Sequence, residues 1–312
     1  MPTRRDFMQQ SAAAALVTSV CAHPIAASGA DDMTAPAATG MTLRAIPSTG
    51  EKIPVIGMGT SGSFEVGTDA AARDPLREVL RRFVAGGARL IDTAPSYGTA
   101  ESVLGDLLAE LKLRDQVFLA TKLSSVGREA GAAQFAQSLA RLRTDKVELL
   151  QVHNLRDWQV QLALARELKA EGKVRYVGLT HYVDSAHAEL AAAMRDSKPD
   201  FIQINYSPTQ RAAEAELFPL AQELGIAVLA NRNFDDGALF GKVRGQALPA
   251  WAAEIGATSW AQLFLKFVLS HDAVTAVIPA TSKPDNQSDN LRAGMGTLLD
   301  EKQREALIAA VG

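Results

Sequence analysis

The chain has 312 residues, of which 47% are hydrophobic and 21% are charged, and its net charge is −3 at pH 7. This composition is typical of a globular protein and excludes the disordered and fibrous classes. Positive and negative residues are interspersed, and no basic cluster beyond the first few residues suggests nucleic acid or an anionic membrane as a partner.

The first 30 residues have the layout of an export signal. Arg4 and Arg5 precede an apolar, alanine-rich run at 11–20, and small residues suited to cleavage follow. The run is too short for a membrane-spanning helix, which needs about 20 residues. The paired arginines, with Phe7 two residues on, resemble a twin-arginine export signal. A disordered cytosolic tail is the alternative interpretation.

We therefore expect a signal peptide at 1–30 that is cleaved between Ala26 and Asp31, followed by a flexible linker at 31–41. The expected partner is the twin-arginine export machinery, the expected location is the periplasm, and no stable membrane insertion is expected. Cys21, the only cysteine, would leave with the signal; it is a lipidation candidate, but Thr18-Ser19-Val20 before it is a poor match to a lipobox.

From residue 42 onward, short apolar runs alternate with amphipathic patterns whose apolar residues recur at three- and four-residue spacing. The apolar runs predict eight strands, at 55–59, 89–92, 117–121, 147–152, 174–180, 201–205, 226–230 and 274–279. The amphipathic patterns predict helices between them, at 75–85, 101–111, 132–142, 159–171, 186–194 and 213–224.

Eight strands alternating with helices predict an α/β fold, a (β/α)8 TIM barrel, with one catalytic domain at 42–312. A doubly wound open sheet is the rival, but the first strand lacks the glycine spacing of a dinucleotide-binding turn. The segments 43–46 and 52–53 predict an N-terminal hairpin that caps the barrel floor. Two extra helices, at 259–269 and 301–310, are expected outside the barrel.

Three successive strand ends carry titratable side chains. Asp92 ends the second strand and Tyr97 follows it, Lys122 ends the third strand, and His153 ends the fourth. Taken singly, each is typical of a cap, a rim or a solvated residue. Function in this fold lies at the carboxyl ends of the strands, so the set of four predicts a catalytic site there.

The four residues also suggest a mechanism. A tyrosine hydroxyl has a pKa near 10, and we expect the Lys122 cation to lower the pKa of Tyr97. Asp92 would hold Lys122 in place, and His153 would orient a substrate oxygen. Tyr97 would then donate a proton to a carbonyl as hydride arrives at carbon, or accept one in the reverse direction.

These motifs resemble the aldo-keto reductase family. The segment from Asp92 to Gly98, the Thr121-Lys122 pair and the segment from Val152 to Asn154 match the family's tetrad in order and approximate spacing, and the resemblance extends over about 43–307. It implies a catalytic tetrad of Asp92, Tyr97, Lys122 and His153. It also implies a nicotinamide cofactor, usually NADPH, that is bound across the barrel rim.

By the same resemblance, Gln203 would hold the nicotinamide carboxamide, with Thr180 and His181 where the family usually has Ser-Asn. Further cofactor candidates lie at other strand ends and near the last strand: Thr60, Asn231, Arg232, Thr281, Ser282, Lys283, Asn286, Asp289 and Asn290. Thr281 to Lys283 suit a 2′-phosphate, and Asp289 with Asn290 suit the adenine. Lys283 is expected at a helix start, where a phosphate is favoured; a solvated cap residue is the alternative.

The chain departs from the family pattern at three positions. Asn231 begins a segment where the family often has a tyrosine that stacks on nicotinamide, and Arg232 beside it would contact pyrophosphate or form a surface salt bridge. His181 replaces an amide and cannot copy both of its hydrogen-bonding functions. Asn286 replaces an arginine, which weakens the preference for NADPH. We expect NADPH, with NADH as the alternative.

The substrate is expected to be a small carbonyl compound or alcohol. Four aromatic residues of the predicted rim are candidates for an apolar wall or for packing: Phe64, Trp158, Tyr182 and Phe234. The leading hypothesis is an NAD(P)(H)-dependent oxidoreductase; the alternative is a non-catalytic nucleotide-binding sensor or partner-binding barrel. A metal-dependent hydrolase or isomerase is disfavoured because the rim offers no grouped His and carboxylate ligands.

Overall fold

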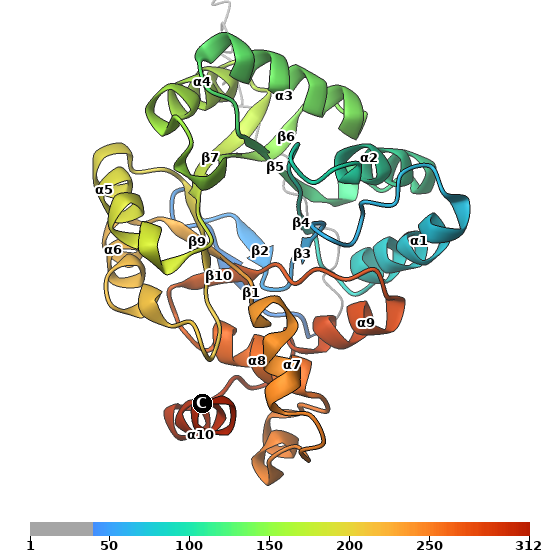
Figure 1. Ribbon diagram of the computed structural model, residues 1–312, viewed down its shortest axis with the longest axis vertical. Helices are drawn as coiled ribbons and strands as arrows, with labels where there is room; N and C mark the ends of the chain where they lie inside the picture. The colour runs from blue at the N-terminus through green and yellow to red at the C-terminus, as the bar shows by residue number, and fades with distance from the viewer. Residues whose placement is uncertain (1–39) are drawn as a thin grey trace, which may run out of the picture. The chain divides into compact units, whose positions relative to one another are not determined.

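Residues 40–312, which the computed structural model describes, form a closed eight-stranded barrel with helices around it (Figure 1). Neighbouring strands are parallel in the order β3 to β10. Parallel bridges from Ile56 to Val277 and from Gly59 to Ala280 close the ring. The (β/α)8 prediction is confirmed, whereas the predicted signal peptide and nearly all of the linker lie outside the described residues.

The barrel strands are β3 (Met58–Gly59), β4 (Leu90–Asp92), β5 (Phe118–Leu123), β6 (Val147–Val152), β7 (Val174–Thr180), β8 (Phe201–Asn205), β9 (Ala227–Asn231) and β10 (Val274–Val277). The helices between them are α1 (Ala70–Ala85), α2 (Ala100–Leu111), α3 (Arg128–Leu142), α4 (Trp158–Ala170), α5 (His187–Ser197) and α6 (Leu217–Leu224). In the last part of the chain follow α7 (Ala238–Lys242), α8 (Trp260–Leu269), α9 (Pro284–Arg292) and α10 (Glu301–Val311).

Apolar stripes bury one face of the helices, and in α1, α8 and α10 a side chain also caps the N-terminus. In α1 the buried residues Leu76, Val79, Leu80 and Phe83 recur every three or four positions, and Asp69 accepts hydrogen bonds from the first-turn amides. Helices α8 and α10 match the two predicted outer helices. Helix α7 was not predicted, because a helix of five residues is too short to show the three- and four-residue spacing of apolar side chains. No helix among residues 40–312 is long and apolar enough to cross a membrane.

The floor of the barrel is closed by the predicted hairpin, in which β1 (Leu43–Ala45) pairs antiparallel with β2 (Lys52–Pro54). Its buried residues Ile46 and Ile53 belong to one apolar cluster with the inward-facing aromatic residues. Among these, the rings of Phe118 and Tyr176 stack with centroids 5.8 Å apart. Apolar side chains thus fill the barrel interior at this end, and the polar side chains of the interior gather toward the opposite rim.

Helices α2 and α3 pack closely beside β5, and a glycine in α2 makes this possible. A Cβ atom at Gly105 would overlap the carbonyl oxygen of Arg141. The close approach brings the Arg141 guanidinium within 2.9 Å of Glu101, whose other oxygen accepts a hydrogen bond from Thr121. Since Thr121 precedes Lys122 in β5, this contact supports the strand that carries the lysine.

Replacing Gly105 with Ala should lower the free energy of unfolding by about 1–3 kcal/mol, because backbone must move to admit the methyl group. Urea unfolding followed by circular dichroism measures this. Gly241→Ala is the matched control, since a Cβ there meets nothing within 4 Å and alanine is the better helix former. Equal stabilities for the two variants would contradict the packing argument.

Candidate active site

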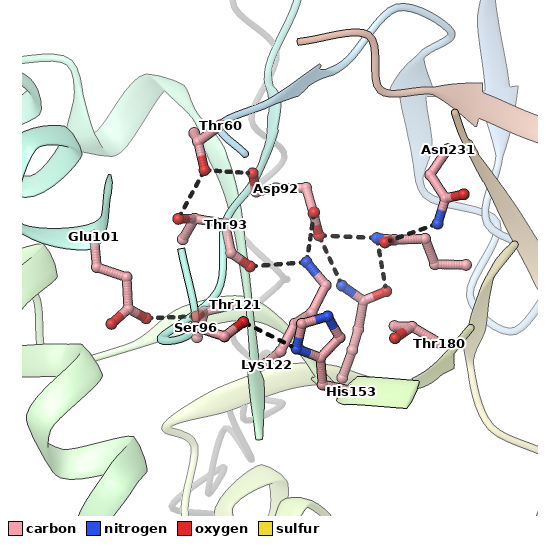
Figure 2. Close-up of polar contacts among 12 residues, drawn as sticks. Thr60, Asp92, Thr93, Ser96, Glu101, Thr121, Lys122, His153, Thr180 and Asn231 are labelled. Carbon is pink, nitrogen blue, oxygen red and sulfur yellow. Dashed lines mark hydrogen bonds and ion pairs between the residues drawn. The ribbon is translucent and has the colours of Figure 1, made fainter. Parts of the chain in front are cut away.

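The four residues of the predicted tetrad meet at the carboxyl end of the barrel. Lys122 Nζ donates to Asp92 Oδ2 at 2.5 Å and to the Thr93 carbonyl at 2.9 Å (Figure 2). Both side chains are buried, with exposed fractions of 0% for Lys122 and 3% for Asp92. The Lys122 Nζ atom lies 5.0 Å from the centroid of the Tyr97 ring, and the His153 ring meets that ring edge-on at 5.8 Å.

The lysine stays cationic although it is buried. Burial by itself lowers the pKa of Lys122, but the neighbouring Asp92 and Tyr97 together raise this pKa above its ordinary value. A buried cation next to a carboxylate is therefore a fixed feature of the site. The positive charge of Lys122 acts on the neighbouring side chains of Tyr97 and His153.

The pKa of Tyr97 differs from the expectation. Burial raises the pKa of the Tyr97 hydroxyl, and this effect outweighs the lowering by Lys122; Asp92 raises it further. The prediction of a lowered pKa was therefore wrong, because it took account of the cation and not of the desolvation. Tyr97 is protonated at neutral pH and is suited to donate its proton to a developing alkoxide.

His153 is a neutral imidazole. Burial, followed by the charge of Lys122 and the proximity of His181, lowers the pKa of His153 to about 3. Its Nδ1 atom lies 3.3 Å from Ser96 Oγ, a partner that the sequence analysis missed (Figure 2). A neutral ring held at one nitrogen leaves the other nitrogen available to a ligand.

Two glutamines complete the surroundings of Asp92. The Oδ1 atom of Asp92 accepts from Gln151 Nε2 at 3.0 Å and from Gln203 Nε2 at 2.9 Å. Gln203 was predicted as a cofactor residue, whereas Gln151 was missed. The signal was its position in β6 two residues before His153, a spacing at which side chains of an extended segment point to the same side.

A cavity of about 650 Å³ opens above these residues. Asp92, Tyr97 and His153 line it, and the predicted residues that join them are Thr60, Thr180, His181, Tyr182, Gln203, Asn231, Arg232 and Phe234. Lining residues that were not predicted are mainly neighbours of these, such as Ser61, Asn154, Asn233, Asp236 and Phe240. Ser61, Asn154 and Asn233 follow the ends of barrel strands by two residues, and this position would have singled them out. Phe240 lies in α7, which was not predicted.

Two predicted aromatic contacts are not at the cavity. Phe64 has an exposed fraction of 0% and belongs to the hydrophobic core. Trp158 is the first residue of α4 and packs against the same core. Of the predicted substrate wall, Tyr182 and Phe234 line the cavity, whereas the other two rings pack in or against the core.

The predicted adenosine-phosphate segment lies outside this cavity. Thr281, Ser282 and Lys283 directly precede α9, with Lys283 at its N-terminal cap position, and Asn286, Asp289 and Asn290 lie within the helix. The carboxylate of Asp289 accepts from Ser259 at 2.5 Å and from Gln262 at 2.6 Å. Asp289 thus ties α9 to α8, a structural role that the prediction did not include.

The loop after β9 has an unusual backbone. Arg232, Asp235 and Asp236 have φ angles of 52°, 51° and 51°, a region that non-glycine residues seldom occupy. The Arg232 guanidinium pairs with Asp236 and donates to the Tyr182 carbonyl. Of the two roles predicted for Arg232, the structure contains the salt bridge.

The hydrogen-bonding polarity of His181 follows from its neighbours. Its Nδ1 atom accepts from the backbone amide of Tyr182 at 3.0 Å, and burial lowers the pKa of the ring. The ring is therefore neutral, with its proton on Nε2. His181 can offer a ligand one donor, as an amide group would, but no acceptor.

Since His153 stays neutral in the folded protein down to about pH 3 while its ordinary pKa is 6.5, the unfolded chain binds a proton that the folded chain does not. The contribution of the neutral His153 to the free energy of unfolding is fully present above pH 6.5 and is lost as the pH falls toward 3. His153→Asn should therefore lose stability less steeply between pH 6.5 and 4, the difference reaching about 1.4 kcal/mol per pH unit at most. Urea unfolding at a series of pH values measures this; parallel curves would contradict the assignment.

The family model of the aldo/keto reductase family matches residues 55–310. The NADH-specific methylglyoxal reductase of Escherichia coli (strain K12) is 31% identical over 198 residues, which cover 53% of this chain and 58% of that protein. Aldo-keto reductase YhdN of Bacillus subtilis (strain 168) is 31% identical over 226 residues, which cover 65% of each protein. The chain thus spans less than two thirds of the length of these two relatives.

Among solved structures, the aldo-keto reductase from Klebsiella pneumoniae in complex with NADPH superposes with a TM-score of 0.71. It is 26% identical, and the match covers 88% of this chain and 96% of that chain. The likeness therefore extends over almost the whole described barrel. With a family match over most of its length and the tetrad in place at the barrel rim, this chain belongs to the aldo/keto reductase family.

Proposed function

We propose that the protein is an NAD(P)H-dependent oxidoreductase that reduces a carbonyl compound to an alcohol, or catalyses the reverse reaction, with Tyr97 as the general acid or base. One observation carries the proposal: a buried Lys122–Asp92 ion pair lies beneath a protonated tyrosine at the wall of the cavity. A structural barrel has no need of a buried charge pair at this place, since removing charges from water is costly.

The residues of this chain would share the proton transfer. The substrate oxygen would lie between the Tyr97 hydroxyl and the His153 imidazole, both of which line the cavity. Tyr97 donates its proton to the oxygen, and the Lys122 cation stabilises the negative charge left on the tyrosine. Asp92 holds Lys122 in place and balances its charge. A bound reduced nicotinamide supplies the hydride.

The cavity fits a nicotinamide carboxamide. Gln203 turns its Nε2 atom to Asp92, so that its Oε1 atom is an acceptor, and His181 adds a donor. The Asn231 Oδ1 and Asn233 Oδ1 atoms have no hydrogen-bond partner among residues 40–312. Since the carboxamide has both donors and an acceptor, Gln203, His181 and Thr180 are the residues that would hold it.

The proposed cofactor is NADPH. Ser282, Lys283 and Asn286 are exposed at the start of α9, where the helix dipole and the lysine favour a phosphate. The Klebsiella relative is described in complex with NADPH, whereas the E. coli relative is named NADH-specific. We therefore propose that the positive charge of Lys283 favours NADPH, which carries the additional phosphate, over NADH. NADH is the alternative cofactor.

The proposed substrate is a small carbonyl compound, with a 2-oxoaldehyde as the first to test because a relative is named methylglyoxal reductase. Tyr182 and Phe234 give part of the cavity an apolar surface. Such a surface favours the carbon side of a small substrate while the tetrad receives its oxygen.

Tyr97→Phe should lower kcat/KM for carbonyl reduction by about 10²–10⁴-fold, because the proton donor is lost, and should leave NADPH affinity within about threefold. NADPH oxidation at 340 nm and fluorescence titration measure the two quantities. The matched control is Tyr176→Phe, which removes a hydroxyl that contacts Thr49 and Glu51 at the barrel floor. Unchanged reduction by the Tyr97 variant would remove this residue as the acid.

We further propose that the chain is exported to the periplasm through the twin-arginine route with its nucleotide already bound. The paired residues Arg4 and Arg5 and the apolar run after them support the route. Because free reduced nucleotide is expected to be scarce outside the cytoplasm, a bound nucleotide that leaves with the folded barrel would supply the reducing equivalents.

Mature protein purified from periplasm should release about one nicotinamide nucleotide per chain on denaturation, as measured by absorbance and chromatography. Its N-terminus should lie within 27–31, after loss of the signal. The double variant Arg4→Lys, Arg5→Lys is the control and should remain in the cytoplasm uncleaved. An empty site that binds NADPH weakly would contradict export with the nucleotide.

A further inference from the structure

Gln151 is a buried polar residue that the proposed reaction does not yet use. It lies in β6, has an exposed fraction of 0%, and is not part of the cavity wall. Its Nε2 atom donates to Asp92 Oδ1 at 3.0 Å, and its Oε1 atom accepts from Gln203 Nε2 at 3.4 Å. It therefore joins a tetrad residue to the residue that we propose for the carboxamide.

The three side chains form one layer of the barrel. Asp92, Gln151 and Gln203 come from β4, β6 and β8, and alternate strands supply the members of a layer in this fold. In the neighbouring strand β7, Gly178 leaves the space that Gln151 occupies: a Cβ atom there would lie 3.0 Å from Gln151 Cγ. The glutamine thus lies in a slot that a larger residue at Gly178 would narrow.

The charge of Asp92 determines how both amides are turned. A carboxylate only accepts hydrogen bonds, so each glutamine must present its NH₂ group to Asp92 Oδ1. Gln203 then uses both hydrogens, one toward Asp92 and one toward Gln151. Its Oε1 atom is left to accept from Asn231 Nδ2 and from a ligand.

We propose that Gln151 is a positioning residue that couples Asp92 to Gln203 and thereby holds the Gln203 carbonyl oxygen as the acceptor for a ligand NH₂ group. This inference rests on the proposed function, in which Gln203 meets the carboxamide. Gln151 does not touch the ligand. Gln151 acts through two hydrogen bonds: it donates to Asp92 Oδ1, and it accepts the second amide hydrogen of Gln203.

The experiment compares two substitutions at Gln151. Gln151→Met keeps the volume but removes both hydrogen bonds, so NADPH affinity and kcat/KM should each fall about tenfold, by the same factor at every pH. In Gln151→Glu, the new carboxyl group shares a site with Asp92, which raises the pKa of one of the two. While protonated, it can donate to Asp92 and accept from Gln203 as the amide does.

Gln151→Glu should therefore bind NADPH within about threefold of wild type at low pH and lose affinity as the pH rises. The measurement is fluorescence titration with NADPH from pH 5 to 9, expressed as a ratio to wild type at each pH. Thermal unfolding at each pH shows that the variants are folded. Because binding is read without turnover, failure of this inference is distinct from failure of Tyr97 as the acid.

Gln161 offers the matched control. It has an exposed fraction of 0%, it lies in α4, and its Nε2 atom also reaches a carboxylate, Asp157 at 3.3 Å. Gln161→Glu creates a similar carboxyl pair away from the cavity and should change stability but not the pH dependence of NADPH affinity. Wild-type affinity in both Gln151 variants, or the same pH dependence in Gln151→Glu and Gln161→Glu, would overturn the proposal.

Discussion

The buried ion pair between Lys122 and Asp92 is the interaction on which the rest of the site depends. Two charges removed from water are tolerated only when their other hydrogen-bonding atoms are also satisfied. Here the Thr93 carbonyl receives a second lysine hydrogen, and Gln151 and Gln203 occupy the second carboxylate oxygen. The pair then affects its neighbours: it keeps a cation beneath Tyr97 and helps to hold His153 neutral.

The barrel makes this arrangement possible by separating its two ends. The hairpin and the inward aromatic residues fill the floor with apolar side chains, so the polar layer can form only toward the other rim. Strand ends that are far apart in sequence meet there because parallel strands with helical crossovers all point the same way. Contacts between the helices and the outer side of the barrel, such as the hydrogen bond from Thr121 to Glu101, support strand β5, which carries Lys122.

The side of the cavity that we propose for the cofactor is less typical of the family than the tetrad. The loop after β9 places Asn231 and the Arg232–Asp236 ion pair at the wall, and Arg232 is engaged within the protein. Three residues of this loop have left-handed backbone conformations without being glycine, which requires that the surrounding contacts over-determine their geometry. In the function that we propose, nicotinamide recognition therefore depends more on the amides of the polar layer than on stacking against a tyrosine.

The sequence alone predicted the fold class and the four tetrad positions, because the alternation of strands and helices is a local pattern. Asp92, Lys122 and His153 stand at or next to strand ends, and Tyr97 follows in the loop after β4. Helix α7 was missed because it is too short to show a period. Only the tertiary structure decided that Phe64 is a core residue, that burial outweighs Lys122 at Tyr97, and that Gln151 contacts Asp92. Burial and cross-barrel contacts join residues that are distant in sequence, so no local pattern encodes them.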